Sequence, residues 1–119
     1  MNKDNKFQFK IRTPLNQIQD AEKIDVDIYG VVVNGASYWD EDTGVSNVLS
    51  QLQGLDPAQN IVLHVNSVGG EVSAGVTIYN RLRALQNKKS VIIEGLAASI
   101  ASIISMAGDE IHMALGSEM

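Results

Sequence analysis

Three short runs of aliphatic and β-branched residues, separated by stretches with helical spacing, constrain the fold of this chain more than any other feature. The runs lie at residues 31–33, 61–65 and 91–93. Such runs are typical of strands in a sheet that is covered on both faces. Because strand-like and helix-like segments alternate, the sequence predicts an α/β fold with a mostly parallel sheet and right-handed crossovers.

The stretches between these runs predict two amphipathic helices. The first starts after a cap at Asp42 or Thr43 and ends before Asp56, and the second starts after Gly70 and ends near Lys88. Apolar residues three or four positions apart define one face of each helix. These are Val45, Val48, Leu49 and Leu52 in the first helix, and Val72, Val76, Tyr79 and Leu82 in the second.

Further elements are predicted toward the two ends of the chain. Residues 7–11 and 24–28 alternate apolar and polar side chains, which is the period of half-exposed strands and predicts an N-terminal hairpin. Small and apolar residues over 97–107 predict a third helix, and residues 111–115 predict a last strand. Since no repeat and no linker interrupts these elements, we expect a single domain over residues 1–119.

Charge and composition exclude several kinds of function. The chain has 14 acidic and 9 basic side chains and a net charge of -5, whereas a nucleic-acid binder needs a basic face. It has no cysteine and two histidines, so we expect neither a metal nor another cofactor. We see no secretory signal and no apolar run of the roughly 20 residues that span a membrane. We therefore expect a cytoplasmic protein that binds neither nucleic acid nor membrane.

The first candidate for chemistry is the junction at residues 66–70, Asn-Ser-Val-Gly-Gly, before Glu71. Gly69 and Gly70 let the backbone turn sharply and let a substrate approach the N–H groups, which suits a cradle for an anion or oxyanion. The alternative is an ordinary strand-to-helix turn that needs positive φ. A phosphate loop is disfavoured because neither Gly-Lys-Ser/Thr nor Gly-x-Gly-x-x-Gly occurs here.

The second candidate is the junction at residues 95–100, directly after a predicted strand. The carboxyl ends of parallel strands are where active sites of open α/β sheets lie. Ser99 then falls at the start of a helix, where free N–H groups favour a developing negative charge. The alternative is that Ser99, Ser102 and Ser105 form a stripe of small residues for close helix packing.

Histidines and acidic residues elsewhere have simpler interpretations. His64 lies inside an apolar strand and is expected to be a hydrogen-bonded structural histidine rather than a base, and the same holds for His112. The acidic residues 40–42 are expected to form a solvated loop, while the aromatic pair Tyr38 and Trp39 either packs as a lid or provides an exposed anchor for a partner.

The two junctions, in this order and at this spacing, resemble the Clp protease proteolytic subunit. The resemblance is greatest to a phage-borne branch, the Clp-like prohead maturation proteases, and it covers the chain from about residue 27 to its end. It rests on residues 66–75 (Asn-Ser-Val-Gly-Gly-Glu-Val-Ser-Ala-Gly), 78–80 (Ile-Tyr-Asn), 95–102 (Gly-Leu-Ala-Ala-Ser-Ile-Ala-Ser) and 106–109 (Met-Ala-Gly-Asp), with residues 28–30 and Trp39 fitting the phage branch.

The resemblance implies a crotonase-like fold and a self-assembling serine peptidase. It assigns Ser99 as the nucleophile and the backbone N–H groups of Gly70 and Ile100 as the oxyanion hole. It also implies that a peptide pairs as a strand with the enzyme, beside Gly69, Gly70 and Glu71. The implied partners are peptide or protein substrates such as phage capsid or scaffold proteins, further copies of the chain, and an ATPase unfoldase, in a bacterial host that carries the gene on a prophage.

The sequence departs from the pattern of the family in two places. Val68 stands where the family usually has proline. The Met-Ile-His-like motif that carries the general base would follow Met119, and the acidic member of the triad would come later still. A serine without its base is a poor nucleophile, so we expect this chain alone to be inactive. We also expect it to expose apolar surface and to self-associate.

Two other functions remain open on the sequence alone. One is a crotonase-like acyl-CoA hydratase, which would need acidic residues at its pocket, where only Glu71 and Glu94 lie beside the two junctions. The other is a non-catalytic assembly module in which Ser99 is a packing residue.

Overall fold

The strands lie in the sheet in the same order as in the chain. The computed structural model describes residues 7–32 and 45–119. Within them β1 (Gln8–Ile11) pairs antiparallel with β2 (Lys23–Val32), and β3 (Asn60–Gly70), β4 (Lys89–Ala97) and β5 (Glu110–Met113) follow in parallel. The helices are α1 (Val45–Gln53), α2 (Val72–Arg83) and α3 (Ile100–Ser105). The predicted α/β fold with a mostly parallel sheet is confirmed.

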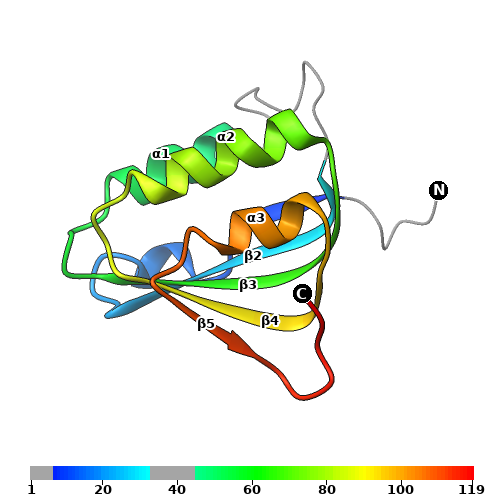
Figure 1. The fold of residues 1–119 in the computed structure, drawn as a ribbon. Coiled ribbons are helices and arrows are strands. Elements are labelled where there is room, and N and C mark those ends of the chain that lie inside the picture. Colours follow the sequence, from blue (N-terminus) through cyan, green and yellow to red (C-terminus); the bar gives the residue numbers. More distant parts are fainter. Residues whose placement is uncertain (1–6, 33–44) are drawn as a thin grey trace.

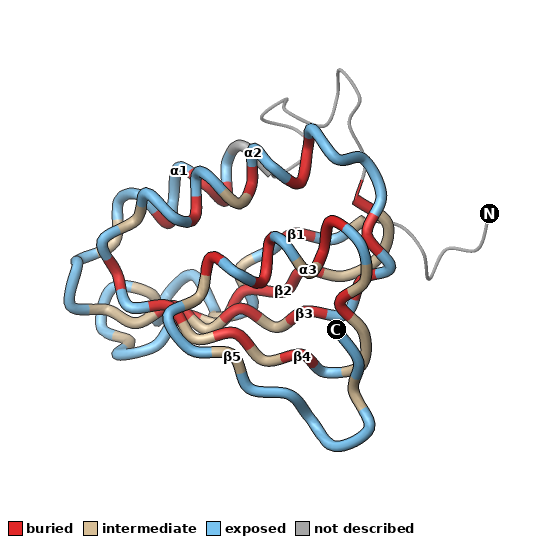
Figure 2. The backbone as a smooth tube through the Cα atoms, in the orientation of Figure 1, coloured by how far each residue is buried: buried red, intermediate tan, exposed pale blue. Residues whose placement is uncertain are grey.

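All three helices lie on one face of this sheet (Figure 1). The core therefore forms between that face and the helices, where alternate strand residues point inward and are buried (Figure 2). The other face carries polar side chains that are partly exposed, among them Asp25 and His64. The expectation of strands covered on both faces is thus wrong for the described residues. The fully buried strand residues are Ile24, Val26, Ile28, Ile61, Leu63, Val65, Val91 and Ile93.

The two N-terminal strands pair antiparallel, as the predicted hairpin requires, and Phe9 lies opposite Ile28. Their connection is longer than a tight hairpin turn, because residues 12–22 include the short 3₁₀ helix η2 (Leu15–Gln17). Gln59 fixes this connection: its side-chain amide donates hydrogen bonds to the carbonyls of Ile18, at 2.7 Å, and Ala21, at 2.8 Å.

The helices differ from the sequence prediction in their buried faces and lengths. On α1 the predicted face is buried at Val48, Leu49 and Leu52; its cap falls at residues 42–43, outside the described residues. On α2, Val72 and Val76 are 62% and 40% exposed. Of the predicted face, Leu82 is buried and Tyr79 packs partly buried against the core, and the other buried residues of α2 are Ala74, Gly75 and Ile78.

The reason for this shift is that α2 packs against α3 as well as against β3. A β-carbon at Gly75 would lie only 2.1 Å from Cγ1 of Ile100, so the small residues of α2 face α3 and the valines turn outward. The third helix is also shorter than predicted, since the strand before it continues to Ala97. No described helix is both long and apolar enough to cross a membrane.

Candidate active site

The diglycine segment belongs to a strand rather than to the turn predicted for it. Strand β3 continues to Gly70 and pairs with β2 up to Val32. Both glycines have positive φ, 90° at Gly69 and 147° at Gly70. A β-carbon at Gly70 would lie 2.0 Å from the carbonyl oxygen of Val32, so only glycine lets the strand lie this close to β2.

Ser99 has the most unusual backbone among the described residues. It precedes the first residue of α3 with φ 54° and ψ -127°, and it is the one described residue other than glycine with positive φ. Such a conformation costs about 1–3 kcal/mol and is found mainly at functional sites. The side chain of Ser99 is exposed rather than directed into the core.

The two junctions predicted from the sequence lie against each other. A β-carbon built on Gly69 would lie 2.9 Å from Cβ of Ser99, 3.2 Å from the nitrogen of Ile100 and 2.6 Å from the carbonyl oxygen of Ala98. Because Gly69 has no side chain, Ser99 can occupy the space beside it. Residues about 30 positions apart in the sequence thus form one site at the carboxyl ends of β3 and β4.

Two backbone N–H groups border this site. The N–H of Glu71 donates to the carbonyl of Val32 at 2.8 Å, toward β2. The N–H of Gly70 belongs to the residue between Glu71 and Gly69, and Gly69 lies against Ser99. The N–H of Ile100 begins α3 and has no hydrogen-bond acceptor among the described residues.

The end of β3 also has a free edge. Its last pair with β4 is Ser67 with Ala97, whereas its pairing with β2 continues to Gly70. Over the described part of the chain, residues 68–70 thus have a strand neighbour on the β2 side alone. A free strand edge of this kind can bind an extended peptide.

The three serines predicted as a packing stripe have different environments. Ser105 is fully buried, and its hydroxyl donates to the carbonyl of Ala101 at 2.8 Å. The hydroxyl of Ser102 donates to the carbonyl of Ser99 at 2.6 Å. The packing interpretation therefore applies to Ser105, whereas Ser99 is exposed beside Gly69.

Neither histidine lies in this site. His64 is on the face of the sheet that no described helix covers, where Nδ1 lies 3.1 Å from Glu94 Oε2 and Nε2 lies 2.9 Å from Asp25 Oδ1. His112 is exposed and contacts Glu110 at 3.4 Å. Both are hydrogen-bonded, as predicted, with the side chain of His64 mostly buried and that of His112 exposed, and within the described residues no histidine contacts Ser99.

Glu94 belongs to a hydrogen-bonded cluster on the same open face. The hydroxyl of Tyr29 donates to Glu94, and Arg12 pairs with Asp27 and donates to Tyr29. Partial burial and the hydrogen bond to Glu94 raise the pKa of Tyr29 to about 12. Burial opposes the ionisation of Glu94, but hydrogen bonds from Tyr29 and His64 outweigh it and lower the pKa of this carboxyl group.

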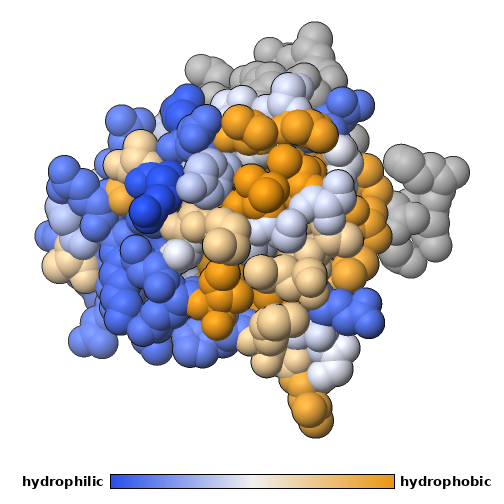
Figure 3. All heavy atoms as spheres, viewed as in Figure 1, coloured by the Kyte–Doolittle hydropathy of each residue, from blue (hydrophilic) through white to orange (hydrophobic). Residues whose placement is uncertain are grey.

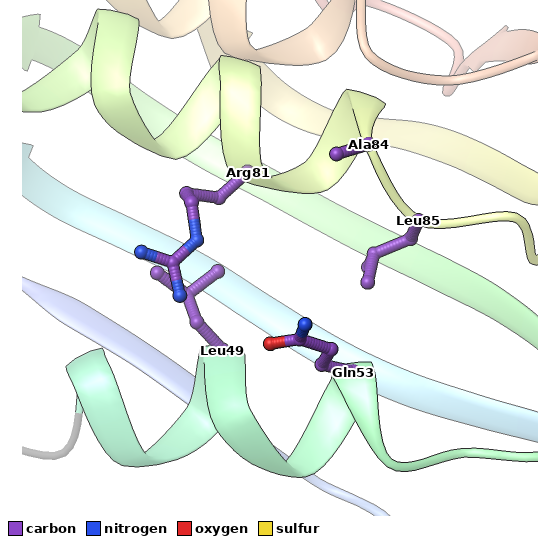
Figure 4. A pocket seen from close by; sticks show the side chains of 5 residues that line it. All are labelled: Leu49, Gln53, Arg81, Ala84 and Leu85. Carbon is purple, nitrogen blue, oxygen red and sulfur yellow. The ribbon is translucent and has the colours of Figure 1, made fainter.

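Two hollows formed by described residues lie away from Ser99. One of about 480 Å³ lies on the open face of the sheet around His64. Another, of about 80 Å³, lies between α1 and α2 and is lined by Leu49, Gln53, Arg81, Ala84 and Leu85 (Figure 4). Neither contains a residue that the sequence analysis assigned to the active site.

Apolar side chains are exposed next to the site. Figure 3 shows them gathered between α2 and α3. They include Val68 at 54%, Val72 at 62%, Val76 at 40%, Ile103 at 45% and Met106 at 52% exposure.

Residues near the end of the chain run beside the end of β4. Glu118 forms a parallel bridge with Leu96, its carbonyl accepts the N–H of Ala97 at 2.9 Å, and its own N–H donates to Gly95 at 2.9 Å. This segment therefore runs parallel to β4, toward the side of the molecule that carries Ser99.

Sequence reasoning missed what Asn66 and Ser67 contribute. The side-chain oxygen of Asn66 accepts the N–H of Leu96 at 3.2 Å, where the ladder between β3 and β4 shifts register. Ser67 is 3% exposed, although the sequence predicts a turn around it. The signal in the sequence was that two polar residues, Asn66 and Ser67, directly follow an apolar strand, where their side chains can form hydrogen bonds with the backbone. The acidic run and the aromatic pair at residues 38–42 lie outside the described residues.

The sheet order β1-β2-β3-β4-β5, with β2 to β5 parallel and helices between the parallel strands, defines the class of α/β proteins with a mostly parallel sheet. A family model described as Clp protease matches residues 18–117. The chain belongs to the Clp protease family.

The curated relatives have the same family name. The ATP-dependent Clp protease proteolytic subunit of Carsonella ruddii is 41% identical over 80 residues, which are 66% of this chain and 40% of that protein. The protein of the same name from Deinococcus radiodurans is 38% identical over 73 residues, which are 59% and 36% of the two chains. The chain thus spans about two fifths of the length of the curated relatives it matches.

Solved structures give the same class of fold. A mutant of ClpP1 from Listeria monocytogenes matches 71% of this chain and 46% of its own, with a TM-score of 0.54 and 29% identity. A member of the enoyl-CoA hydratase/isomerase family matches 91% of this chain and 48% of its own, with a TM-score of 0.62 and 15% identity. The second likeness shows the fold alone.

Proposed function

We propose that this chain carries the nucleophile and the oxyanion hole of a Clp-type serine endopeptidase. The observation that carries the proposal is the exposed Ser99, on a strained backbone, next to Gly69 and to the N–H of Ile100, which no described residue accepts. A strained strand-to-helix turn presents the nucleophilic serine in other hydrolases too. The matched family supports the same activity.

In the proposed reaction, Oγ of Ser99 attacks the carbonyl carbon of a peptide bond and its proton passes to a base. The carbonyl oxygen becomes an oxyanion, which accepts hydrogen bonds from the N–H groups of Gly70 and Ile100. When this intermediate collapses, the C–N bond breaks, the base gives its proton to the leaving nitrogen, and the amine departs from an acyl group on Ser99. The base then takes a proton from water, which attacks the acyl group, and returns the proton to Oγ of Ser99 as the acid is released. The substrate binds as an added strand along residues 69–71, where the edge of β3 is free.

The base is the component that the described residues do not supply. No histidine among them contacts Ser99, so we propose that residues 1–119 alone do not turn over peptide. Residues 117–119 run beside β4 toward Ser99, which supports a base located just beyond Met119. Peptide turnover by the 119-residue chain that disappears in Ser99→Ala would overturn this part of the proposal.

Labelling with a fluorophosphonate tests the nucleophile in the complete gene product. We expect one label per chain, its loss in Ser99→Ala, and its retention in the control Ser102→Ala. Labelling that survives Ser99→Ala would overturn the assignment. If the protein is unlabelled but hydrates an acyl-CoA, the hydratase alternative holds; if it does neither, the assembly module remains. The position of Glu94 argues against the hydratase. Its carboxyl group is hydrogen-bonded to Tyr29 and His64, on the face of the sheet that no described helix covers.

We further propose that the protein acts in the cytoplasm on protein substrates, as a homo-oligomer and with an ATPase unfoldase as partner. The apolar side chains exposed on α2 and α3 support self-association. Sedimentation of the chain over a range of concentrations tests it, and a monomer at high concentration would overturn it. The finer proposal of a phage protease that cleaves capsid or scaffold proteins rests on residues 28–30 and Trp39, and phage head genes beside its reading frame would support it.

A further inference from the structure

The sheet has two irregularities at the same level, just below the candidate active site. In β2 the register with β3 shifts between Tyr29 and Val31, around Gly30, whose φ is 84°. In β3 the register with β4 shifts between Val65 and Ser67. Such shifts leave backbone groups without their ladder partners, and buried groups of this kind need another hydrogen bond.

Ser67 supplies bonds at this level with both its side chain and its backbone. Its hydroxyl donates to the carbonyl of Gly30 at 2.5 Å and accepts the N–H of Gly69 at 3.1 Å. Its own carbonyl accepts the N–H of Ala98 at 3.1 Å. Because Ser67 is only 3% exposed, water does not compete readily for these bonds.

These bonds connect the two halves of the site through one residue. Gly69 is the residue that lies against Ser99 and Ile100, and Ala98 is the residue before Ser99. Loss of the hydroxyl would leave the carbonyl of Gly30 and the N–H of Gly69 unpaired, and the strand from Gly69 to Gly70 could then move relative to Ser99. The neighbouring Asn66 cannot replace it, since Asn66 is exposed and bonds to Leu96 on the β4 side.

We propose that Ser67 is a positioning residue that holds the Gly70 N–H at the correct distance from Ser99. The proposal rests on the proposed peptidase function. Ser67 contacts no reacting atom, and it acts through Gly69. A misplacement of about 1 Å in such a site lowers the rate about 100-fold, whereas substrate affinity depends on the whole edge of β3. The expected defect is therefore in the rate of the chemical step and not in binding.

The test compares Ser67→Ala with Ser105→Ala, a matched control. Ser105 is also a buried serine whose hydroxyl donates to a backbone carbonyl, but it lies at the far end of α3 from Ser99. In the complete gene product we expect Ser67→Ala to lower the maximal rate of fluorophosphonate labelling about 10- to 100-fold, with the half-saturating concentration unchanged. Ser105→Ala should keep the labelling rate of the unsubstituted protein, although we expect urea unfolding to show that it loses about as much stability as Ser67→Ala.

A second measurement uses the 119-residue chain and needs no enzymatic activity. We expect Ser67→Ala to speed amide hydrogen exchange at Gly69 and to shift the amide resonances of Gly70 and Ile100, and Ser105→Ala to leave these three unchanged. If Ser67→Ala does not fold, Ser67→Thr and Ser67→Cys decide. Both substitutions keep a hydrogen-bond donor at the position of the Ser67 hydroxyl. Because a hydroxyl is a stronger donor than a thiol, Ser67→Thr should be labelled faster than Ser67→Cys.

The outcomes separate this proposal from the proposed function. Equal labelling rates in Ser67→Ala and Ser105→Ala, or unchanged amides at Gly69 and Gly70, would overturn the positioning role and leave the nucleophile assignment standing. Absence of Ser99 labelling in the unsubstituted protein would overturn the peptidase, while the amide measurements would still decide whether Ser67 holds the diglycine segment.

Discussion

The two ends of the parallel sheet are built in opposite ways. At the end where the strands begin, polar side chains bond to backbone carbonyls: Asn87 donates to Asp56 and Gln59 at 2.9 Å, and Lys89 donates to Leu85 and Asn87 at 2.8 Å. Lys89 is 2% exposed, and its burial lowers its pKa despite the attraction of Asp109.

At the end where the strands finish, the backbone itself is unusual. Gly69, Gly70 and Ser99 have positive φ, the ladders shift register, and the N–H of Ile100 has no acceptor among the described residues. The first end therefore stabilises the fold, whereas the second holds backbone strain and, among the described residues, a donor without an acceptor. Substitutions at the two ends should accordingly differ in kind, and the following predictions test that difference.

The largest effect is expected for Gly70→Ala at the carboxyl end. The new methyl group would meet the carbonyl oxygen of Val32 at 2.0 Å, in addition to the strain of φ 147°. We expect the free energy of unfolding to fall by about 3 kcal/mol or more. Gly116→Ala is the control, since Gly116 has φ 83° with nothing within 4 Å and should lose about 1–2 kcal/mol from strain alone. Urea unfolding measures both, and equal losses would contradict the close approach of β2.

The next effect concerns the opposite end. Asn87→Ala removes the side-chain donor to the carbonyls of Asp56 and Gln59, although Asp56 still accepts the N–H of Gln59, and we expect a loss of about 1–3 kcal/mol in the free energy of unfolding. The amide resonances of Gly70 and Ile100 should not move. The control Asn80→Ala, on the exposed side of α2, should be neutral or slightly stabilising. A disturbed Ser99 site in Asn87→Ala would show that the two ends are coupled.

A smaller effect of opposite sign is expected at Ser99. Ser99→Gly relieves the strain of φ 54°, and after the entropy cost of glycine we expect a gain of about 1 kcal/mol in stability. Ser102→Gly, three residues later and inside α3, should lose about 0.5–1 kcal/mol instead. Thermal unfolding of the two variants measures the pair, and a destabilised Ser99→Gly would show that its backbone conformation is not strained.

The smallest effect is expected for the hydrogen-bonded cluster on the open face, which belongs to neither end. The pKa of Tyr29 is raised to about 12, so its neutral form stabilises the fold below pH 10 and this contribution disappears as the pH rises from about 10 toward 12. The pKa of Glu94 is lowered, so its contribution is present above its ordinary pKa near 4.3 and is lost as the pH falls through the lowered value.

Removing the hydroxyl group of Tyr29 tests the expected pH dependence of Tyr29 and that of Glu94 in one variant. Tyr29→Phe should change the free energy of unfolding by less than about 1 kcal/mol at pH 7 and should flatten its pH dependence at both extremes. Urea unfolding midpoints between pH 3 and 11, with Tyr79→Phe as control, measure this. A pH profile of Tyr29→Phe that coincides with that of the unsubstituted protein would contradict the contact between Tyr29 and Glu94.

The sequence predicts the sheet well because its signal is local. The aliphatic runs at residues 61–65 and 91–93 indicate strands without reference to their neighbours, and their alternation with helices indicates parallel pairing. The buried face of α2 was not predictable in this way, because Gly75 rather than a larger residue faces Ile100, and this depends on contact with α3. The single covered face of the sheet likewise depends on where the helices pack.

The candidate site was predictable in its parts but not in its connections. Glycines at residues 69–70 and a serine after β4 indicated two junctions, and the contact between Gly69 and Ser99 is what the parallel order of β3 and β4 implies. The strain at Ser99 and the bonds of Ser67 depend on register shifts in two strands. Such shifts follow from the packing of the whole sheet and leave no periodic pattern in the sequence.

The missing side chain at Gly75 has an evolutionary consequence. Ile100 fills the space that a β-carbon at residue 75 would need. Any substitution of Gly75 should therefore displace Ile100, whose N–H group begins α3. In a random mutagenesis screen for loss of Ser99 labelling, substitutions of Gly75 should therefore score like substitutions next to Ser99, although Gly75 is a buried residue of α2.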